Sequence, residues 1–346
     1  MSTNPRPVAV VATSLTPAYT AFEGPEAALV MTCVNELLES TGLRREELEF
    51  TIAGSCDYLG GTPFSFVMNL EGVGAWPPVY ESHVEMDGAW ALSEAWLRLQ
   101  CGDVDTALVV GSGRASSGRP REVFALQTDP YTMAPLGADP VSLAGLQARA
   151  LLDSGKATEA DFAAAAARAL PATSGVSIEE LLKADYWCDP LRAHDVAAPA
   201  DGAAALILVA GDRARELPGE PVWLTGMDHR IESHHLGLRD LTDSPSARLA
   251  AKGAGAHDGP VDIAELMVVH SPEETILRTA LGLGGETVIN PSGGPLAGNP
   301  VMATGLARVV EVVRRIAAGE ARRGLAHASS GPCLQQNLVA VLEGEH

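Results

Sequence analysis

A glycine-rich segment near the C-terminal end of the chain has the composition of a ligand-binding loop. Residues Val288–Leu306 read VINPSGGPLAGNPVMATGL. The loop in this segment contains Gly293, Gly294 and Gly298, which permit close approach of the backbone to a ligand. Asn299 followed by Pro300 is typical of a helix N-cap and first helical residue, so we expect a helix to begin there. The free N–H groups of a helix start could hold a thioester oxygen or an enolate. The alternative is a purely structural loop and cap.

Four further positions carry side chains or backbone groups suited to the same chemistry. His270 follows the apolar run MVV, and its ordinary pKa lies near neutrality, so it is the best candidate for a general base. Glu85 and Asp87 precede a strongly amphipathic stretch, where buried carboxylates can orient a donor or exchange a proton. The backbone N–H near Gly331 is a candidate oxyanion donor. The structural alternatives are that His270 ends a strand and that Glu85 favours a helix start through the helix dipole.

Tyr131 and Cys333 are weaker candidates. Tyr131 lies in the sequence TDPYT and could act as an acid or base, although turn formation around Pro130 explains it equally well. Cys333 is expected to be a small buried residue.

The five cysteines are widely spaced and form no CxxC pair, which indicates a reducing compartment and argues against a zinc site. No spacing of cysteine and histidine resembles a metal motif.

The elements that must position these residues alternate along the chain. Short apolar runs predict strands near 8–12, 50–53, 79–80, 106–110, 203–210, 222–226, 262–268, 287–289, 324–328 and 336–342. Apolar residues recurring at three and four predict helices near 27–40, 64–70, 86–100, 141–154, 158–170, 245–253, 273–282 and 299–317. Such alternation implies an α/β protein with parallel strands and helical crossovers. The similar order of elements in two blocks favours an internal duplication.

The net charge of −20 excludes one class of function. A surface that binds nucleic acid must neutralise phosphates with Lys and Arg, and no basic run is present, so we expect no nucleic-acid partner. The same charge opposes long-range attraction of an anionic ligand, which local dipoles or a partner would have to supply. No signal-peptide pattern and no apolar run of membrane-spanning length occur, so we expect a cytoplasmic protein.

Several motifs in sequence order resemble the thiolase superfamily. The segment from Asn290 to Gly305 is similar to the family pattern N-x-x-G-G-x-x-x-x-G-H-P-x-G-x-(S/T)-G. The other landmarks are Gly102–Gly111 (G-x-x-D-x-x-(L/V)-V-x-G), Asp201–Ala205 (D-G-A-A-A), Glu265–Pro272 (E-x-H-x-x-F, with His270 taken as the histidine) and Ser329–Asn337 in the C-terminal catalytic loop. The resemblance covers essentially the whole chain.

The resemblance implies an α/β thiolase fold, with two similar βαβαβαββ halves in a five-layer αβαβα arrangement and an inserted loop domain. We therefore expect the N-terminal half to comprise residues 1–112 plus 196–215. Residues 113–195 are expected to form the inserted loop or lid region, and residues 216–346 the C-terminal half.

Two departures from the family pattern bear on the chemistry. Thiolases read C-x-S-G before the first catalytic helix, and this chain has Glu85-Met86-Asp87-Gly88, so Glu85 stands in place of the nucleophilic cysteine. A carboxylate is a poor nucleophile toward a thioester. Asn299 replaces the G-H-P histidine and can donate to an oxyanion but cannot exchange protons at neutral pH. The second family cysteine corresponds to Ser329.

The remaining groups fit cleavage of a C–C bond without an acyl-enzyme. His270 would take the proton of a β-hydroxyl group, and Asn299 and the N–H near Gly331 would stabilise the enolate.

The resemblance is strongest to sterol-carrier-type thiolases of bacterial steroid catabolism, known as lipid-transfer proteins, some of which are aldolases. It implies an acyl-CoA substrate, with coenzyme A as part of the substrate and no bound cofactor or metal. It also implies a homodimer or a heterodimer with a paralogue, and a small OB-fold/zinc-ribbon partner. An acyltransferase and a non-catalytic subunit remain as alternatives.

Overall fold

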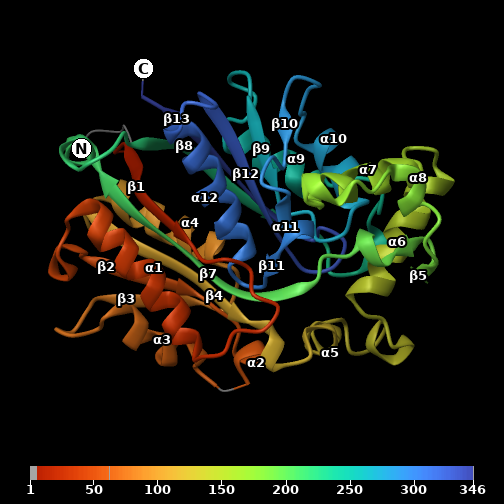
Figure 1. Cartoon of the computed structure of the whole chain (residues 1–346), viewed down its shortest axis with the longest axis horizontal. Helices are drawn as coiled ribbons and strands as arrows, with labels where there is room; N and C mark the ends of the chain where they lie inside the picture. The colour runs from red at the N-terminus through yellow and green to blue at the C-terminus, as the bar shows by residue number, and fades with distance from the viewer. Residues whose placement is uncertain (1–5, 62, 346) are drawn as a thin grey trace.

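Two halves of the chain repeat the same topology in the computed structural model, which describes residues 6–61 and 63–345 (Figure 1). The first half contains β1 (Val8–Leu15), α1 (Glu26–Thr41), β2 (Phe50–Gly54), α2 (Asp57–Gly60), α3 (Ser65–Val73), β3 (Glu81–Val84), α4 (Gly88–Cys101), β4 (Thr106–Arg114) and β7 (Pro199–Ala210). The second half contains β8 (Val222–Ile231), α9 (Pro245–Gly253), β9 (Ile263–Leu266), α10 (Glu273–Ala280), β10 (Val288–Ile289), α11 (Gly294–Ala297), β11 (Asn299–Pro300), α12 (Thr304–Ala317), β12 (Arg323–Ser330) and β13 (Gln336–Gly344).

The strand order makes the repeat explicit. The first half runs β1-β7-β4-β2-β3 and the second runs β8-β13-β12-β9-β10. In each half the first two pairings in this order are antiparallel and the last two are parallel. The two sheets join where β1 meets β8, through the pairs Ala9–Trp223 and Val10–Val222. The predicted internal duplication is therefore confirmed.

Helices cover both sheets and also separate them. α4 and α12 pack against each other between the two sheets, α1 covers the outer face of the first sheet, and α9 covers the outer face of the second. Leu92 of α4 and Val309 of α12 are fully buried in the hydrophobic core that this central layer shares with both sheets. The predicted five-layer αβαβα arrangement is confirmed.

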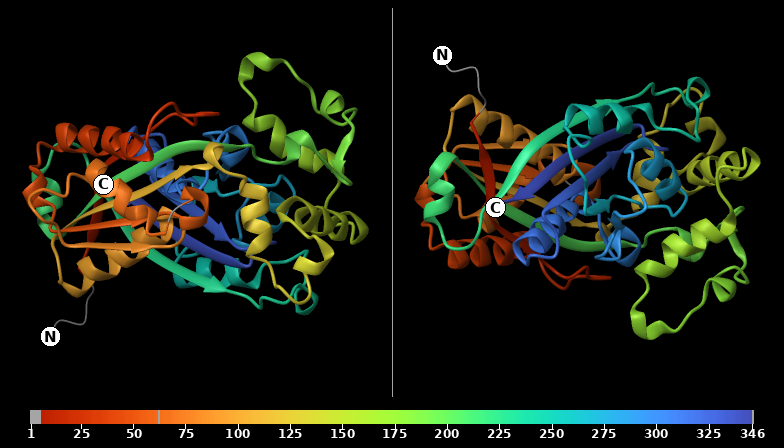
Figure 2. Two further views of the ribbon diagram at one scale, coloured as in Figure 1. Left: turned by 90° about the horizontal axis from the view of Figure 1, so that it is seen from below. Right: turned by 90° about the horizontal axis from the view of Figure 1, so that it is seen from above.

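The insert between β4 and β7 packs on the second half. It contains α5 (Pro120–Leu126), α6 (Pro140–Asp153), α7 (Glu159–Ala169), α8 (Ile178–Leu181), β5 (Tyr186–Cys188) and β6 (Leu191–Arg192). Leu151 of α6 and Phe162 of α7 belong to the same buried cluster as Leu277 of α10. Figure 2 shows the insert at the end of the molecule opposite the chain termini.

Glycines allow the central helices to lie close to the first sheet. A Cβ on Gly88 would lie 2.8 Å from the Cα of Gly111, and a Cβ on Gly113 would lie 1.8 Å from the carbonyl oxygen of Val301. Both distances are shorter than nonbonded atoms tolerate, so only glycine fits. This close packing brings the starts of α4 and α12 to the same place.

Several predicted boundaries were wrong. α12 begins at Thr304, not at Asn299, because Asn299 and Pro300 pair with Pro199 and Ala200 as the two-residue strand β11. α4 begins at Gly88, not at Met86, because Asp87 is its N-cap. The predicted strand at 79–80 is found at 81–84, and β4 continues through 111–113, which were expected to end it.

Candidate functional site

A cavity of about 550 Å³ lies where the two halves and the insert meet. Four segments form its polar wall: 85–87 before α4, 267–273 from the end of β9 to the start of α10, 299–302 from β11 toward α12, and 329–335 from the end of β12 toward β13. Each segment follows a strand or begins in one, and a rigid sheet is a good support for functional residues. The cavity is therefore the natural candidate for an active site.

Backbone strain is concentrated at this cavity. Among the described residues, five non-glycine residues have positive φ, and three of them, Met302, Cys333 and Leu334, line the cavity. Such conformations cost roughly 1–3 kcal/mol each and tend to occur at functional sites. Met302, at φ 73°, is held in place because its carbonyl accepts the N–H of Gly88 at 2.9 Å.

Asp87 joins the starts of the two central helices. Its carboxylate accepts the N–H of Ala89 in α4 (2.8 Å) and the N–H groups of Gly305 (2.8 Å) and Leu306 (3.0 Å) in α12. Burial raises the pKa of Asp87 to about 6, and these three backbone donors act against that rise. Both carboxylate oxygens are occupied by backbone donors, so Asp87 fixes the framework of the site.

His270 and Glu273 form a buried pair in the loop before α10. His270 Nδ1 lies 2.9 Å from Glu273 Oε1, and both residues line the cavity. Glu273 Oε2 accepts the backbone N–H groups of Val269 (2.9 Å) and His270 (3.1 Å). A histidine held in this way can act as a general base through its other ring nitrogen.

Asn299 presents an amide to the cavity. Its Oδ1 accepts the hydroxyl of Thr304 at 2.7 Å, which leaves the Nδ2 group as the donor. Ser329 and Gly331 also line the cavity, and the N–H of Ser329 is directed to the sulfur of Met267 at 3.4 Å. The side chain of Asn299 is thus a candidate donor to a developing oxyanion.

Two cysteines line the cavity, and neither has the features of an activated nucleophile. Burial raises the pKa of Cys56 to about 11, and the nearby Glu85 carboxylate adds to the rise. Burial also raises the pKa of Cys333 to about 12, and its thiol faces the carbonyl of Leu143 at 3.5 Å. A nucleophilic cysteine needs a lowered pKa or an adjacent base that frees the thiolate.

The remaining walls are largely apolar and belong to the insert. Phe124 of α5 and Val141 and Leu143 of α6 face the cavity, as does Trp187 of β5. The guanidinium carbon of Arg121 lies 5.6 Å from the Trp187 ring centroid. An apolar cavity with a few polar groups at one end suits a ligand with an apolar body.

The structure brings some of the expected site residues to the cavity and leaves others outside it. His270, Asn299, Glu85, Asp87, Ser329 and Gly331 line the cavity. Tyr131 is 88% exposed and is not part of the wall, because its TDPYT segment forms a surface turn around Asp129. The three loop glycines that were expected to bind substrate also lie outside the wall: Gly293, Gly294 and Gly298.

His270 does not stand at the histidine position of the family pattern. In the pattern E-x-H-x-x-F, the histidine is two residues after the glutamate, and this position after Glu265 is Met267. His270 falls at the position of the phenylalanine, yet its ring lines the cavity. The histidine in the cavity therefore comes from a position three residues further along the same loop.

Sequence reasoning missed Glu273. The available signal was its place three residues after His270, at the start of a predicted helix, where the two side chains can meet. His327, which the sequence allowed at the same cleft but which was expected to be structural, is buried on β12 outside the cavity wall, and its ring lies 2.9 Å from Asn337 Oδ1.

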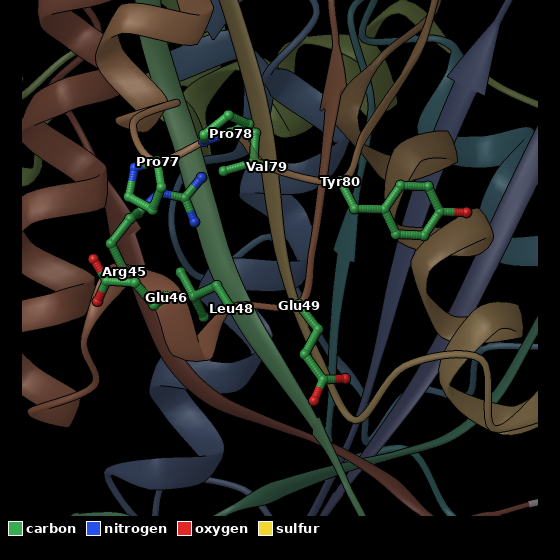
Figure 3. A pocket seen from close by; sticks show the side chains of 8 residues that line it. All are labelled: Arg45, Glu46, Leu48, Glu49, Pro77, Pro78, Val79 and Tyr80. Atoms are coloured by element: carbon green, nitrogen blue, oxygen red, sulfur yellow. The ribbon is translucent and has the colours of Figure 1, made fainter.

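A second, smaller cavity of about 200 Å³ lies beside the start of β2. Figure 3 shows its lining, which includes Arg45, Glu46, Glu49 and Tyr80. The Nε atom of Arg45 donates to the carbonyls of Val73 and Gly74. No histidine, cysteine or serine is among the described residues that line this cavity, so it lacks the histidine that the larger cavity contains.

Two kinds of feature are absent from the described part of the chain. No group of three or more His, Cys, Asp or Glu side chains in residues 6–61 and 63–345 is arranged to hold a metal ion. Within the same residues, no helix has both the length and the hydropathy that a membrane crossing requires.

Comparisons with known proteins agree with this architecture. No family model matches the sequence. Acetyl-CoA acetyltransferase from Methanothermobacter thermautotrophicus is 30% identical over 181 residues, which cover 45% of this chain and 47% of that protein. The chain spans about half the length of the curated relatives it matches.

Solved structures align over nearly the whole chain. The Ltp2-ChsH2(DUF35) aldolase superposes with a TM-score of 0.79 and 18% identity, covering 98% of each chain. Human mitochondrial 3-ketoacyl-CoA thiolase superposes with a TM-score of 0.76 and 16% identity, covering 98% of this chain and 99% of the other. Together with the duplicated five-layer topology, these likenesses show that the protein has the thiolase fold.

Proposed function

We propose that this protein cleaves a C–C bond of an acyl-CoA thioester, as a retro-aldolase acting on a β-hydroxyacyl-CoA. The observation that carries the proposal is the composition of the cavity. It combines a buried histidine base and an amide donor, and its two cysteines have raised pKa values. A retro-aldol step needs a base and an oxyanion donor and needs no acyl-enzyme.

The proposed reaction assigns one role to each group. His270 Nε2 takes the proton of the β-hydroxyl group, and the Cα–Cβ bond breaks as the β-carbon becomes a carbonyl. The bonding electrons pass to the thioester as an enolate, whose oxygen accepts a hydrogen bond from Asn299 Nδ2. A proton then returns to the α-carbon. The products are an aldehyde or ketone and a shortened acyl-CoA, so that atoms and electrons balance.

Glu85 stands where a thiolase would carry its nucleophile, and its surroundings favour a supporting role. The Oε1 atom of Glu85 accepts the backbone N–H of Asp57 at 2.7 Å. The carboxylate therefore stabilises the start of α2 and adds negative charge at the cavity beside Cys56. We propose no covalent step on Glu85, because a carboxylate is a poor nucleophile toward a thioester.

Acyl transfer is the second candidate function. The partial match to an acetyl-CoA acetyltransferase and the likeness to a thiolase structure favour it. Within the cavity, Cys56 is the thiol with a carboxylate as hydrogen-bond partner, since Glu85 contributes to its pKa both as a charge and as a hydrogen-bond partner. Acyl transfer would require Glu85 to remove the thiol proton before attack.

The substrate and assembly follow from the same proposal. The apolar walls fit a lipid side chain, and we propose a role in steroid or other lipid side-chain catabolism. The solved aldolase bears the name of two components, Ltp2 and ChsH2(DUF35), which supports testing a small OB-fold/zinc-ribbon partner for this chain. We also propose a homodimer or a dimer with a thiolase-like paralogue.

A product assay distinguishes the candidates. The protein, alone and with its candidate partner, is given a side-chain β-hydroxyacyl-CoA and, in parallel, a β-ketoacyl-CoA with free CoA. Release of an aldehyde or ketone and a shorter acyl-CoA without free CoA, lost in His270→Ala, supports the retro-aldolase. Cleavage that requires free CoA and is lost in Cys56→Ser supports acyl transfer. Silence in both assays with the partner present contradicts both and indicates a supporting subunit.

A further inference from the structure

The contacts of Glu273 tie the His270 ring to the backbone of its own loop. Glu273 is the first residue of α10, and its Oε1 lies 2.9 Å from His270 Nδ1. Its Oε2 accepts the backbone N–H groups of Val269 and of His270 itself. The carboxylate thus holds both the ring and the main chain of the histidine, which fixes the ring relative to its backbone.

The insert holds the same loop from the other side. Val196 forms an antiparallel bridge with His270, and Ala197 donates its N–H to Val269 at 2.9 Å. Ser271 donates its N–H to the carbonyl of Asp195 (2.9 Å) and its hydroxyl to the carboxylate of Asp195 (2.5 Å). The loop is therefore fixed on both flanks, and the His270 ring cannot leave Glu273 without breaking buried hydrogen bonds.

This geometry decides which ring nitrogen carries the proton. A carboxylate only accepts hydrogen bonds, so the Nδ1 that faces Glu273 must be the protonated nitrogen of the neutral ring. Nε2 then carries the lone pair. Because His270 lines the cavity, Nε2 is the ring nitrogen that is available to a ligand there. When Nε2 takes a proton, the imidazolium is stabilised by the carboxylate 2.9 Å away.

We infer that Glu273 is a positioning residue, which holds His270 in the Nδ1–H tautomer and thereby makes its Nε2 the base that faces the substrate. The inference rests on the proposed retro-aldolase function for its activity readout. It also accounts for the placement of the base three residues beyond the family position, because the side chain of residue 270 meets the Glu273 carboxylate at the first turn of α10.

The tautomer is tested without substrate. Nitrogen-15 chemical shifts of the His270 ring, assigned by comparison with His270→Gln, are expected to show Nδ1 protonated and Nε2 bare at neutral pH. In Glu273→Gln, the new amide can donate to Nδ1, and the ring is expected to switch to the Nε2–H tautomer. An unchanged tautomer in folded Glu273→Gln overturns the inference.

The neighbouring Glu274 provides a matched control. It lies in the same first turn of α10, is also buried, and pairs with Arg168 on α7, not with His270. Glu274→Gln removes an equal charge and is expected to leave the His270 tautomer unchanged. A switch in both variants would show that the charge of the helix start, and not the contact with Glu273, sets the tautomer, and this result would also overturn the inference. Thermal melts of both variants establish that they fold.

The activity readout separates positioning from binding. Glu273→Gln is expected to lower kcat roughly 100-fold with KM nearly unchanged, because the base is lost while the apolar walls are intact. The double variant His270→Ala/Glu273→Gln is expected to be no slower than His270→Ala alone, since the two residues act as a unit. Independent, multiplying losses contradict the inference. If the wild-type protein cleaves no β-hydroxyacyl-CoA, the proposed function fails, while the tautomer measurement still decides the role of Glu273.

Discussion

Replacing His327 is expected to change how the stability of the protein depends on pH. His327 Nε2 lies 2.9 Å from Asn337 Oδ1, and the Nδ2 of Asn337 donates to Ser246 Oγ (2.7 Å) and to the carbonyl of Leu334 (2.8 Å). Because the amide oxygen faces the ring, Nε2 must donate and Nδ1 carries the lone pair. Nδ1 is buried and has no hydrogen-bond partner among the described residues. Protonation would therefore bury an unpaired N–H.

The size of the effect follows from the pKa of His327. Burial lowers this pKa from 6.5 to about 4, and the hydrogen bond with Asn337 acts in the opposite direction. Between pH 4 and pH 6.5, roughly, the unfolded chain binds a proton at His327 and the folded chain does not. The free energy of unfolding therefore rises with pH between these two pKa values. The full effect is about 3 kcal/mol, of which about 2 kcal/mol falls between about pH 4.5 and pH 6.5.

Asp87 has the opposite effect over nearly the same range. Burial raises its pKa from 3.8 to about 6, so the folded chain holds a proton that the unfolded chain has released. Its contribution is therefore greatest below pH 3.8 and is lost as the pH rises through about 6, again by about 3 kcal/mol in total. In the wild-type protein, these two contributions largely offset each other.

Urea unfolding at about pH 4.5 and about pH 6.5 tests this reasoning. The stability difference between the wild type and His327→Gln is expected to grow by about 2 kcal/mol in favour of the wild type as the pH rises. For Asp87→Asn the corresponding difference is expected to change by about 2 kcal/mol in the other direction. Any pH-independent cost of either substitution cancels in this comparison. A constant difference for His327→Gln would refute the assignment of a neutral buried ring with an unpaired nitrogen.

Three further outcomes follow from the packing of the site. Asn299→Ala is expected to lower kcat of the proposed cleavage roughly 100-fold, and a wild-type rate would remove Asn299 from the mechanism. Gly113→Ala is expected to destabilise the protein by about 3 kcal/mol or more in urea unfolding, because the added Cβ would lie 1.8 Å from the carbonyl oxygen of Val301. Arg308→Met is expected to cost about 3–5 kcal/mol, since it leaves the fully buried Glu265 carboxylate without its ionic partner, and an unchanged urea midpoint would contradict this.

The fold could be predicted because its signals are local and repeated. Apolar runs and helical periodicity predicted the long strands and helices, and the motifs in order predicted the duplicated thiolase topology that the strand order confirms. The short elements were not predicted: α2, α5, α8, α11, β5, β6 and β11. The start of α12 was missed because Asn299 and Pro300 satisfy the local rule for a cap, while tertiary pairing with β7 places them in a strand. A carboxylate 217 residues away from Thr304, that of Asp87, then caps the helix.

The site was predictable only in part for a related reason. His270 and Glu85, both candidates from the sequence, line the same cavity, although they follow strands of different halves, β9 and β3. Tyr131 was expected at the site but is exposed outside the cavity. Its position depends on how a long insert folds, and turn residues give no long-range information. Glu273 was missed because its importance lies in a side-chain contact and not in a motif.

Because Asp87 caps both central helices, the second half depends on the first for its helix cap and the first does not depend on the second. The N-cap of α4 is Asp87 itself, whereas the N-cap of α12, Ala303, offers no side-chain acceptor. The second half therefore depends on a residue of the first to complete its central helix, and the first half gains a covered surface in return. A chain divided between β7 and β8 should consequently yield two fragments that fold only together, with the second fragment the less ordered when alone.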